Sequence, residues 1–310
     1  MSARPDASSL RASVVVRTHN RARLVGRAVR ALADQTLPAE AYEIVVVDDG
    51  SVDETPQVLA RLACEVPNLR PVSLPDNCGV ADSGNQAVKH VRSEILLFTD
   101  DDCIPARDWI ERMCETLEQA DIVAGAIASP SRPYLRLCHN ISQSHNLLPH
   151  GHKRRVTFSA TANMGFRCAR FRSLGGFEAG RRMAEDMELC LRARAAGHDI
   201  LFDPHAAVTH DPERSGMRVV LRHAADHAQS TISLRNTYAK LLNTPVVLSS
   251  SWLLLGSAPV IAAAVTLKAY SANPALWRYL HTAPVFFLAK LAWCLGAARG
   301  VGRRPPAPTK

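Results

Sequence analysis

The sequence predicts an α/β fold in which helices flank a mostly parallel sheet and a C-terminal apolar helical appendage follows. Short β-branched or apolar runs alternate with segments whose apolar residues recur at helical spacing, an order typical of right-handed crossover units. Several runs end directly in polar residues, and ligands of such sheets bind beside the carboxyl ends of the strands. The 310 residues, 47% of them hydrophobic and 21% charged, suffice for one large domain with an appendage.

The first two strands are each expected to end in polar residues. Ser13-Val14-Val15-Val16 predicts a strand that leads into the polar segment 17–21. A second strand over 42–47 stops at Asp48-Asp49-Gly50-Ser51. The segment between them places apolar residues on one face of a predicted helix: Leu24, Val25, Ala28, Val29 and Leu32. This order brings both polar strand ends to one edge of a parallel sheet.

Three carboxylates, Asp100-Asp101-Asp102, follow the buried apolar run 95–98. Carboxylates packed together raise one another's pKa unless a cation neutralises them. The cluster therefore predicts a divalent metal site with oxygen ligands at the carboxyl edge of the sheet. A solvated acidic loop is the alternative.

The middle of the chain continues the alternation and then loses it. A helix is predicted through 85–91, another over 109–117, and a strand over 122–127. Residues 139–155 lack a clear period and carry four histidines, one lysine and two arginines. We expect them to form a basic loop near a phosphate ligand or a plain solvated loop.

A second acidic pair, Glu185-Asp186, opens a predicted helix that Gly197 ends. Acidic residues in a first turn complement the helix dipole, so capping is the alternative to a chemical role. A short strand over 200–202 and then His210 follow. Taken alone, His210 would be an ordinary surface or core histidine.

Composition narrows the partners and the compartment. The net charge of +8 suits an anionic membrane face or a phosphate-bearing substrate. Nucleic acid is not expected, because the basic residues are dispersed, aromatic residues make up 5%, and no nucleic-acid motif is present. Eight cysteines without a C-x-x-C pair favour reduced thiols in a cytoplasmic protein. The polar segment 1–11 has no apolar core that would predict secretion.

The C-terminal segment differs in composition from the rest. No charged residue occurs from Asn243 to Leu267, and a second apolar stretch, 283–298, contains Lys290 and precedes a basic end. A pair of membrane-inserted or spanning helices, an amphipathic anchor on the membrane surface and a packed helical cap are the three interpretations. The tryptophans and terminal arginines favour a bilayer interface.

The order of these motifs resembles an inverting family 2 glycosyltransferase over residues 13–211. The resemblance implies a GT-A fold, with a Rossmann-like sheet whose nucleotide-binding half joins an acceptor half. The implied domains are a flexible N-terminus (1–11), a nucleotide-sugar-binding half (12–128), an acceptor-binding half (129–242) and membrane-associated helices with a basic tail (243–310). The motifs that carry the resemblance are 14–21, 45–53, 77–85, the triple aspartate, Gly175-Gly176-Phe177, Glu185-Asp186 with Leu189 and Arg192, and His210.

The resemblance also implies roles for residues. Asp100 and Asp102 would hold Mg²⁺ or Mn²⁺ on the donor diphosphate, with His210 reaching the metal. Asp186 is the expected base for the acceptor hydroxyl, with Glu185 as its alternate. The implied donor-binding residues are Arg17, Thr18, Asn20, Asp48, Asp49, Asn77, Gly79, Asn85, Asp100 and Asp101, with Asp49 on the base. Where many members carry an arginine before the asparagine, this chain has Gly84, so Lys153 to Arg155 become candidates for the diphosphate contact.

The expected function is transfer of a sugar from a nucleotide-diphosphate sugar to a carbohydrate or lipid-linked acceptor, at the cytoplasmic face of the cell membrane. Two alternatives stay open. A nucleotidyltransferase of similar fold would show a glycine-rich basic loop after the first strand, which segment 17–20 lacks. A membrane-bound scaffold without activity would need neither the aspartate cluster nor Asp186.

Overall fold

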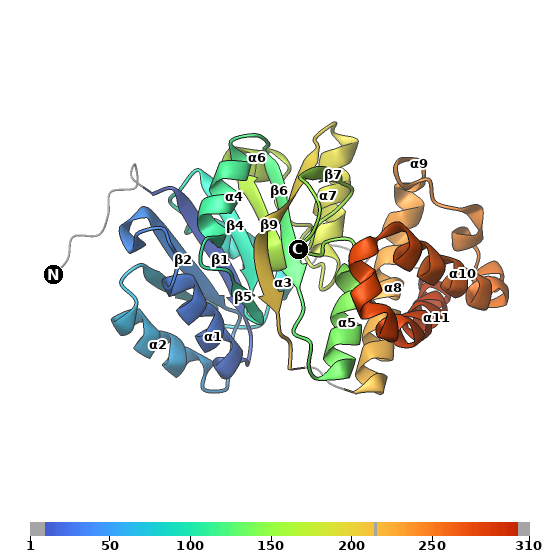
Figure 1. Ribbon diagram of the computed structural model, residues 1–310. Coiled ribbons are helices and arrows are strands. Elements are labelled where there is room, and N and C mark those ends of the chain that lie inside the picture. Colours follow the sequence, from blue (N-terminus) through green and yellow to red (C-terminus); the bar gives the residue numbers. More distant parts are fainter. Residues whose placement is uncertain (1–9, 214–215, 303–310) are drawn as a thin grey trace. The chain divides into compact units, whose positions relative to one another are not determined.

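The computed structural model describes residues 10–213 and 216–302. The chain divides into two compact units. The sheet unit comprises the described residues of 10–128 and 149–211, and the helical unit those of 129–148 and 212–302. Figure 1 shows the strands of the sheet unit side by side with helices around them, and the helical unit as a separate group of packed helices.

The first half of the sheet unit is a parallel sheet. Its strands lie in the order β3 (Leu69–Ser73), β2 (Tyr42–Asp48), β1 (Ala12–Thr18) and β4 (Ile95–Asp100). Strand β2 is buried along its whole length, as expected for a strand covered on both faces. The accompanying helices and turns are α1 (Ala22–Ala33), η2 (Ala39–Ala41), α2 (Thr55–Glu65) and α3 (Val80–Val88).

The second half of the sheet mixes directions. Strand β8 (Met164–Arg167) runs antiparallel between β4 and β6 (Ile122–Ala128), and β9 (Ile200–His210) lies parallel to β6. Two short strands, β5 (Cys103–Pro105) and β7 (Arg154–Val156), pair antiparallel with β9, completing a nine-stranded sheet among the described residues. The helices and turn here are α4 (Trp109–Leu117), η3 (Thr161–Asn163), α6 (Cys168–Ser173) and α7 (Glu185–Ala195).

An aromatic cluster fills the core between β4, β8 and α6. Phe98, Phe166, Phe171 and Phe177 lie with ring centroids 5.2 to 6.3 Å apart, mostly edge to face. Such pairs add to the stabilisation that burial alone gives. Because Phe98 lies two residues before Asp100, this packing fixes the end of β4 that carries the acidic cluster.

The helical unit is built on close contact between two helices. A Cβ atom on Gly296 would lie 2.0 Å from the Ala225 carbonyl oxygen, and one on Gly300 2.7 Å from the Gln229 carbonyl oxygen. These two glycines therefore allow α11 to pack directly on α8. The elements are α5 (Tyr134–Ser144), α8 (Met217–Thr237), α9 (Ala239–Leu242), η4 (Val246–Ser249), α10 (Ser251–Ala272), η5 (Pro274–Thr282) and α11 (Ala283–Gly300).

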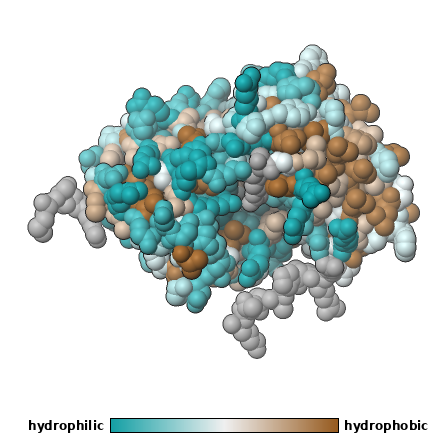
Figure 2. Space-filling view, turned by 90° about the horizontal axis from the view of Figure 1, so that it is seen from below, coloured by the Kyte–Doolittle hydropathy of each residue, from teal (hydrophilic) through white to brown (hydrophobic). Residues whose placement is uncertain are grey.

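Apolar side chains face outward on α10. Leu253, Val260 and Leu267 expose more than half of their surface, and Trp252 exposes 84%. Figure 2 shows a broad brown area over the helical unit. By length and composition alone, two segments are apolar enough to cross a membrane, Ser251–Ala272 and Pro274–Gly300.

The predicted α/β fold with apolar C-terminal helices is confirmed, and three local predictions are corrected. The helix expected through 85–91 is α3, which ends at Val88. Residues 139–155 begin with the second half of α5, continue as a loop over 145–153 and end in β7; the helical part was missed because His139, Asn140 and Ser142 are buried polar residues that mask the helical period. The strand expected over 200–202 extends to His210.

Candidate active site

Strand register brings the first site residues together. In the parallel pair of β1 and β4, Arg17 lies opposite Asp100, and in the pair of β1 and β2, Thr18 lies opposite Asp48. All four residues stand at the carboxyl ends of their strands, where an open α/β sheet binds ligands. The polar strand ends were predicted to meet at this edge of the sheet, and the strand register identifies which residues lie opposite one another.

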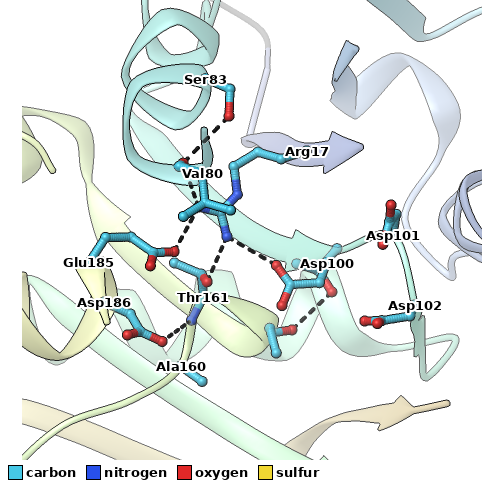
Figure 3. Close-up of polar contacts among 12 residues, drawn as sticks. Arg17, Val80, Ser83, Asp100, Asp101, Asp102, Ala160, Thr161, Glu185 and Asp186 are labelled. Atoms are coloured by element: carbon cyan, nitrogen blue, oxygen red, sulfur yellow. Dashed lines mark hydrogen bonds and ion pairs between the residues drawn. The ribbon is translucent and has the colours of Figure 1, made fainter. Parts of the chain in front are cut away.

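Arg17 is the centre of the site (Figure 3). Its Nη1 donates to Glu185 Oε1 at 2.9 Å and to the Val80 carbonyl oxygen at 2.8 Å. Its Nη2 donates to Asp100 Oδ1 at 3.1 Å and to Thr161 Oγ1 at 2.7 Å. Burial lowers the pKa of Arg17, but the charges of Glu185 and Asp100 outweigh that effect and leave the pKa raised. Arg17 is therefore a fixed cation that joins β1, β4, α3, η3 and α7.

The turn after β4 separates the three aspartates. Asp101 is buried and accepts hydrogen bonds from Thr18 Oγ1 at 2.8 Å and from Arg21 Nη1 at 2.7 Å. Arg21 also lies 3.2 Å from Asp102 Oδ2. Burial raises the pKa of Asp101 to about 6, although the Arg21 charge opposes the rise. Asp101 thus fixes the turn, whereas Asp100 contacts Arg17 and Asp102 contacts Arg21. The expected role of Asp100 and Asp102 as metal ligands stays a prediction.

The structure places His210 beside Asp102. In the antiparallel pair of β5 and β9, Cys103 lies opposite His210, and His210 Nε2 is 3.4 Å from Asp102 Oδ1. More than one hundred residues separate the two in sequence, so only the pairing of these strands joins them. His210 therefore lies beside Asp102, and its expected contact with a metal stays a prediction.

The two acids at the start of α7 have different environments. Glu185 is held by Arg17, whereas Asp186 Oδ1 accepts from the Met187 amide at 2.7 Å and Oδ2 lies 3.4 Å from the Thr161 amide. Burial raises the pKa of Asp186 to about 7, and the charge of Glu185 adds to the rise. Ala184, just before them, has φ of 63°, a left-handed conformation that is uncommon for a residue other than glycine.

Asp48 and Asp49 organise the neighbouring loops. Asp48 Oδ1 accepts from the Ser51 amide at 3.0 Å. Asp49 accepts from the Cys78 amide at 2.8 Å and from the Gly79 amide at 2.9 Å. Asn20 Oδ1 accepts from two amides of the following loop, at 2.8 and 3.2 Å. These contacts give the loops a fixed shape. The expected donor contacts of Asp48, Asp49, Asn20, Asn77 and Gly79 stay predictions.

Asn85 anchors the glycine turn. Its side chain donates to the Phe177 carbonyl oxygen and accepts from the Phe177 amide, both at 2.9 Å. A Cβ on Gly84 would lie 2.9 Å from the Phe177 ring, and the Arg17 guanidinium lies 5.8 Å from the centroid of the same ring. The space beside residue 84 is therefore filled by Phe177, which gives a physical reason for glycine there.

The buried residue Asn163 holds the short helix η3, which carries Thr161, in place. Asn163 Oδ1 accepts from Trp109 Nε1, and Nδ2 donates to the carbonyl oxygens of Ala126 and Ala206, all at 2.8 Å. A Cβ on Gly125 would lie 2.2 Å from Asn163 Oδ1. These contacts hold η3 against β6, β9 and α4, and η3 in turn presents Thr161 to Arg17.

The residues present fit a divalent cation in their chemistry. Among residues 10–213 and 216–302, no three His, Cys, Asp or Glu side chains already form a closed group for an ion. However, burial raises the pKa of Asp100, and the nearby charge of Asp102 raises it further despite Arg17. The Asp100 side chain is 32% exposed, and a further positive charge would stabilise its carboxylate form. Oxygen and imidazole donors lie at the same turn.

The candidate diphosphate contacts at residues 153–155 lie elsewhere. Lys153 is 3.3 Å from Asp203 Oδ2, Arg155 pairs with Asp199, and Arg154 lies over the Phe202 ring. All three belong to β7 or its preceding loop, and pairing with β9 directs them to these partners. The prediction that they contact the donor is not supported by this arrangement.

Three site residues escaped the sequence analysis. Arg21 and Thr161 bind the acidic cluster and Arg17. The third is a candidate only: Arg182 is exposed, and its Cγ would lie 3.7 Å from a Cβ on Gly79, in the loop that Asp49 holds. An arginine directly after a strand or just before an acidic helix could be selected from sequence as a candidate site residue. Only the fold shows which of these arginines lie close to the acidic cluster.

Comparison with known proteins identifies the class. The family model "Glycosyl transferase family 2" matches residues 13–174, more than half of the chain, and "Glycosyl transferase family group 2" matches 95–295. The chain therefore belongs to glycosyl transferase family 2.

The chain is similar to several particular proteins. Glycosyltransferase AglE of Haloferax volcanii is 30% identical over 117 residues, 37% of this chain. The pre-mycofactocin glycosyltransferase of Mycobacterium tuberculosis is 27% identical over 215 residues, 64% of this chain. The match spans 38% and 42% of the lengths of these two relatives.

A solved structure shows the fold. The mannosyltransferase PcManGT of Pyrobaculum calidifontis, in complex with GDP-Man and Mn²⁺, superposes with a TM-score of 0.66 and 23% identity, covering 95% of this chain and 88% of that one. The predicted GT-A fold is confirmed.

Proposed function

We propose that this chain is an inverting, metal-dependent glycosyltransferase that moves a sugar from a nucleotide-diphosphate sugar to an acceptor hydroxyl. The observation that carries the proposal is the convergence of Asp100, Asp102, His210 and Asp186 at one edge of the sheet, around Arg17. In this function Asp48, Asp49 and the loop at Gly79 receive the nucleotide. The division into a donor half (12–128) and an acceptor half (129–242) belongs to the same proposal.

The acidic edge has to neutralise the donor diphosphate. Asp100, Asp102 and His210 would hold Mg²⁺ or Mn²⁺, and the similar mannosyltransferase was solved with Mn²⁺. When bound, the cation acts as a Lewis acid that stabilises the negative charge of the departing nucleoside diphosphate. Thr18 and Arg21 keep Asp101 turned aside, which directs Asp100 and Asp102 toward the ligand.

Asp186 takes the proton of the acceptor hydroxyl. Its pKa of about 7 leaves a large fraction deprotonated at neutral pH and still makes it a competent proton acceptor. Glu185 is already bound to Arg17, so we assign it the role of positioning residue. A single displacement with one base on the far side of the sugar ring inverts the anomeric carbon.

A membrane partner accounts for the apolar surface of α10. Burying each exposed methylene is worth roughly 0.8 kcal/mol, so the exposed Leu253, Val260 and Leu267 favour an apolar environment. We propose association with the cytoplasmic face of the cell membrane, where sugar nucleotides are available, and a lipid-linked or membrane-held acceptor such as a cell-envelope glycoconjugate.

The donor test uses the full-length chain with Mn²⁺. Titration with UDP-, GDP- and dTDP-sugars should show saturable binding of at least one, and EDTA should abolish turnover. Asp186→Asn should keep donor affinity while transfer falls by about 10²–10⁴-fold, because a base acts on the acceptor in the transition state. Binding without turnover for any acceptor would favour a scaffold, and nucleotide transfer to a sugar phosphate would favour a nucleotidyltransferase.

The membrane test replaces the exposed side chains and keeps the fold. The triple variant Leu253→Gln, Val260→Gln and Leu267→Gln should lose most vesicle flotation, whereas Val219→Gln, an exposed valine on α8, should not. Circular dichroism checks that both variants are folded. A wild-type protein that is monodisperse without detergent would contradict the membrane proposal.

A further inference from the structure

The helical unit holds cationic side chains that the proposed chemistry does not use. Its described residues include ten lysines and arginines and only two acidic residues, Glu213 and Asp226. Asp226 pairs with Arg222 one turn away on the same helix. We define the cationic cluster as His145, which follows α5, His223, His227 and Arg235 of α8, and Lys290 of α11.

Three helices position the cluster. His223 and His227 lie one turn apart on α8, with their rings stacked at a centroid distance of 6.4 Å. Further along α8, the Arg235 guanidinium lies 5.5 Å from the centroid of the Trp293 ring. Lys290 Nζ lies 4.6 Å from the centroid of Phe286, and the His145 ring lies 5.1 Å from the same Phe286 ring. The positions are fixed by aromatic packing, not by carboxylates.

The donors of the cluster are incompletely used. Lys290 Nζ donates to the Ser142 carbonyl oxygen at 2.8 Å, which engages one of its three protons. Arg235 Nε and His145 Nδ1 are buried and have no hydrogen-bond partner in the described part of the chain. A buried polar nitrogen without a partner costs free energy, so a native site of this kind calls for a further ligand.

The electrostatics point in the same direction. Burial lowers the pKa of His227 to about 4, and the charges of His223, Lys290 and Arg235 contribute to the fall. Burial lowers the pKa of His145 to about 3, with a contribution from the Lys290 charge. Near neutral pH both histidines are therefore uncharged, and the charges of Arg235 and Lys290 repel each other, so an anion between these two cations would relieve the repulsion.

We propose that the cationic cluster binds a phosphate group. Phosphate offers several acceptor oxygens and a negative charge, which match the incompletely used donors of Arg235 and Lys290. The phosphate can belong to a lipid or be free in solution, and the two sources are separable by experiment. The inference rests on the proposed function only in assigning such a lipid to the acceptor side.

Trp293 provides a local signal for the test. Because Arg235 lies over its ring, an anion that engages Arg235 should change the fluorescence of Trp293. Full-length protein in neutral detergent is titrated with inorganic phosphate at constant ionic strength. A parallel titration uses phosphatidylcholine vesicles with and without phosphatidylglycerol. Trp293→Phe should remove the signal.

Variants of three cationic residues distinguish specific phosphate binding at the cationic cluster from non-specific electrostatic attraction of anions to the protein. Arg235→Gln and Lys290→Gln should each weaken phosphate affinity by about tenfold, the effect of losing one charge-assisted hydrogen bond. Lys268→Gln removes the same charge from an exposed position on α10 and should leave affinity within twofold. Arg235→Lys should recover part of the affinity, which separates loss of charge from misfolding.

The outcomes are distinct. Saturable binding of free phosphate that Arg235→Gln weakens supports the site with a soluble ligand. The same pattern with phosphatidylglycerol vesicles alone supports it with a lipid. Equal losses for Lys268→Gln and Arg235→Gln, or no saturable signal from either probe, would overturn it. If phosphate binds but no sugar nucleotide does, the glycosyltransferase proposal fails and this site stands.

Discussion

The pH dependence of transfer tests Asp186 as the base. Burial raises the pKa of its carboxyl to about 7, with Glu185 adding to the rise. Only the deprotonated carboxylate accepts a proton, so the rate should rise with pH through about 7. At pH 5, two units below that value, roughly 1% of the molecules hold Asp186 deprotonated, so the rate should be roughly a hundredfold below its plateau.

Two variants should shift the rising limb of the pH–rate profile in opposite directions. Glu185→Gln removes a negative charge that raises the pKa of Asp186, so its limb should move to lower pH. Arg17→Gln removes a positive charge that lowers the pKa of Asp186, so its limb should move to higher pH. Glu188→Gln, one turn along the same helix and paired with Arg192, is the matched control and should leave the limb in place.

The assay is kcat/KM for the acceptor between pH 5 and pH 9, with saturating donor and Mn²⁺, because this quantity reports the pKa of the base in the donor-bound enzyme before the acceptor binds. A limb near pH 4, or one that Glu185→Gln leaves unmoved, would refute the reasoning.

The same pKa shift has a consequence for stability. An unfolded aspartate titrates near 3.9, so the folded state binds this proton more tightly than the unfolded chain does. Stability is therefore lost as the pH rises from about 4 to about 7, by up to roughly 4 kcal/mol, and the loss persists above that range. Asp186→Asn removes this titration, so its melting temperature should exceed that of the wild type at pH 8, by a margin that shrinks toward pH 4.

Three further predictions concern the surroundings of the base. Asp102→Asn should lower turnover by about a hundredfold or more through loss of a metal ligand, and a folded variant with full activity in EDTA would contradict that assignment. Arg182→Gln should weaken donor binding in a titration without affecting melting temperature, because the side chain is exposed beside Gly79. Gly125→Ala should destabilise the protein by about 1–3 kcal/mol in urea unfolding, because its Cβ meets Asn163, whereas Gly256→Ala meets nothing.

The parallel half of the sheet was predicted from local sequence patterns. The parallel strands β1, β2 and β4 are mostly apolar runs, and the polar residues at their ends, acidic in β2 and β4, mark the functional edge. Strand β8 was missed because it is four residues long and includes a glycine. Helix α5 was missed because it buries polar side chains, so its apolar residues do not repeat at the helical period. Short strands and polar buried faces depend on tertiary partners, which a local window does not contain.

The site shows the same division. The acidic groups were visible in sequence because carboxylates after a buried strand are costly without a partner. The role of Arg17 was not visible, since its contacts with Asp100 and Glu185 join residues 83 and 168 positions away. Lys153 to Arg155 were chosen as candidate diphosphate contacts because they form a basic run in the sequence. A run of basic residues suggests an anion, and only the pairing of β7 with β9 shows that acidic and aromatic neighbours already engage them.

The two arginines explain how five neighbouring acids can serve different purposes. Arg21 engages Asp101, and Arg17 engages Glu185, so the charges of these two carboxylates are met within the protein. Asp100 contacts Arg17, which also contacts Glu185, and the pKa of Asp100 is raised. A further cation would therefore stabilise the carboxylate form of Asp100. No described arginine donates a hydrogen bond to Asp186, and its pKa is raised by burial and by the charge of Glu185. Carboxylates whose environments differ in this way can act as ligand and as base at the same pH. The placement of two cations thus separates the functions of acids that the sequence presents as equivalent.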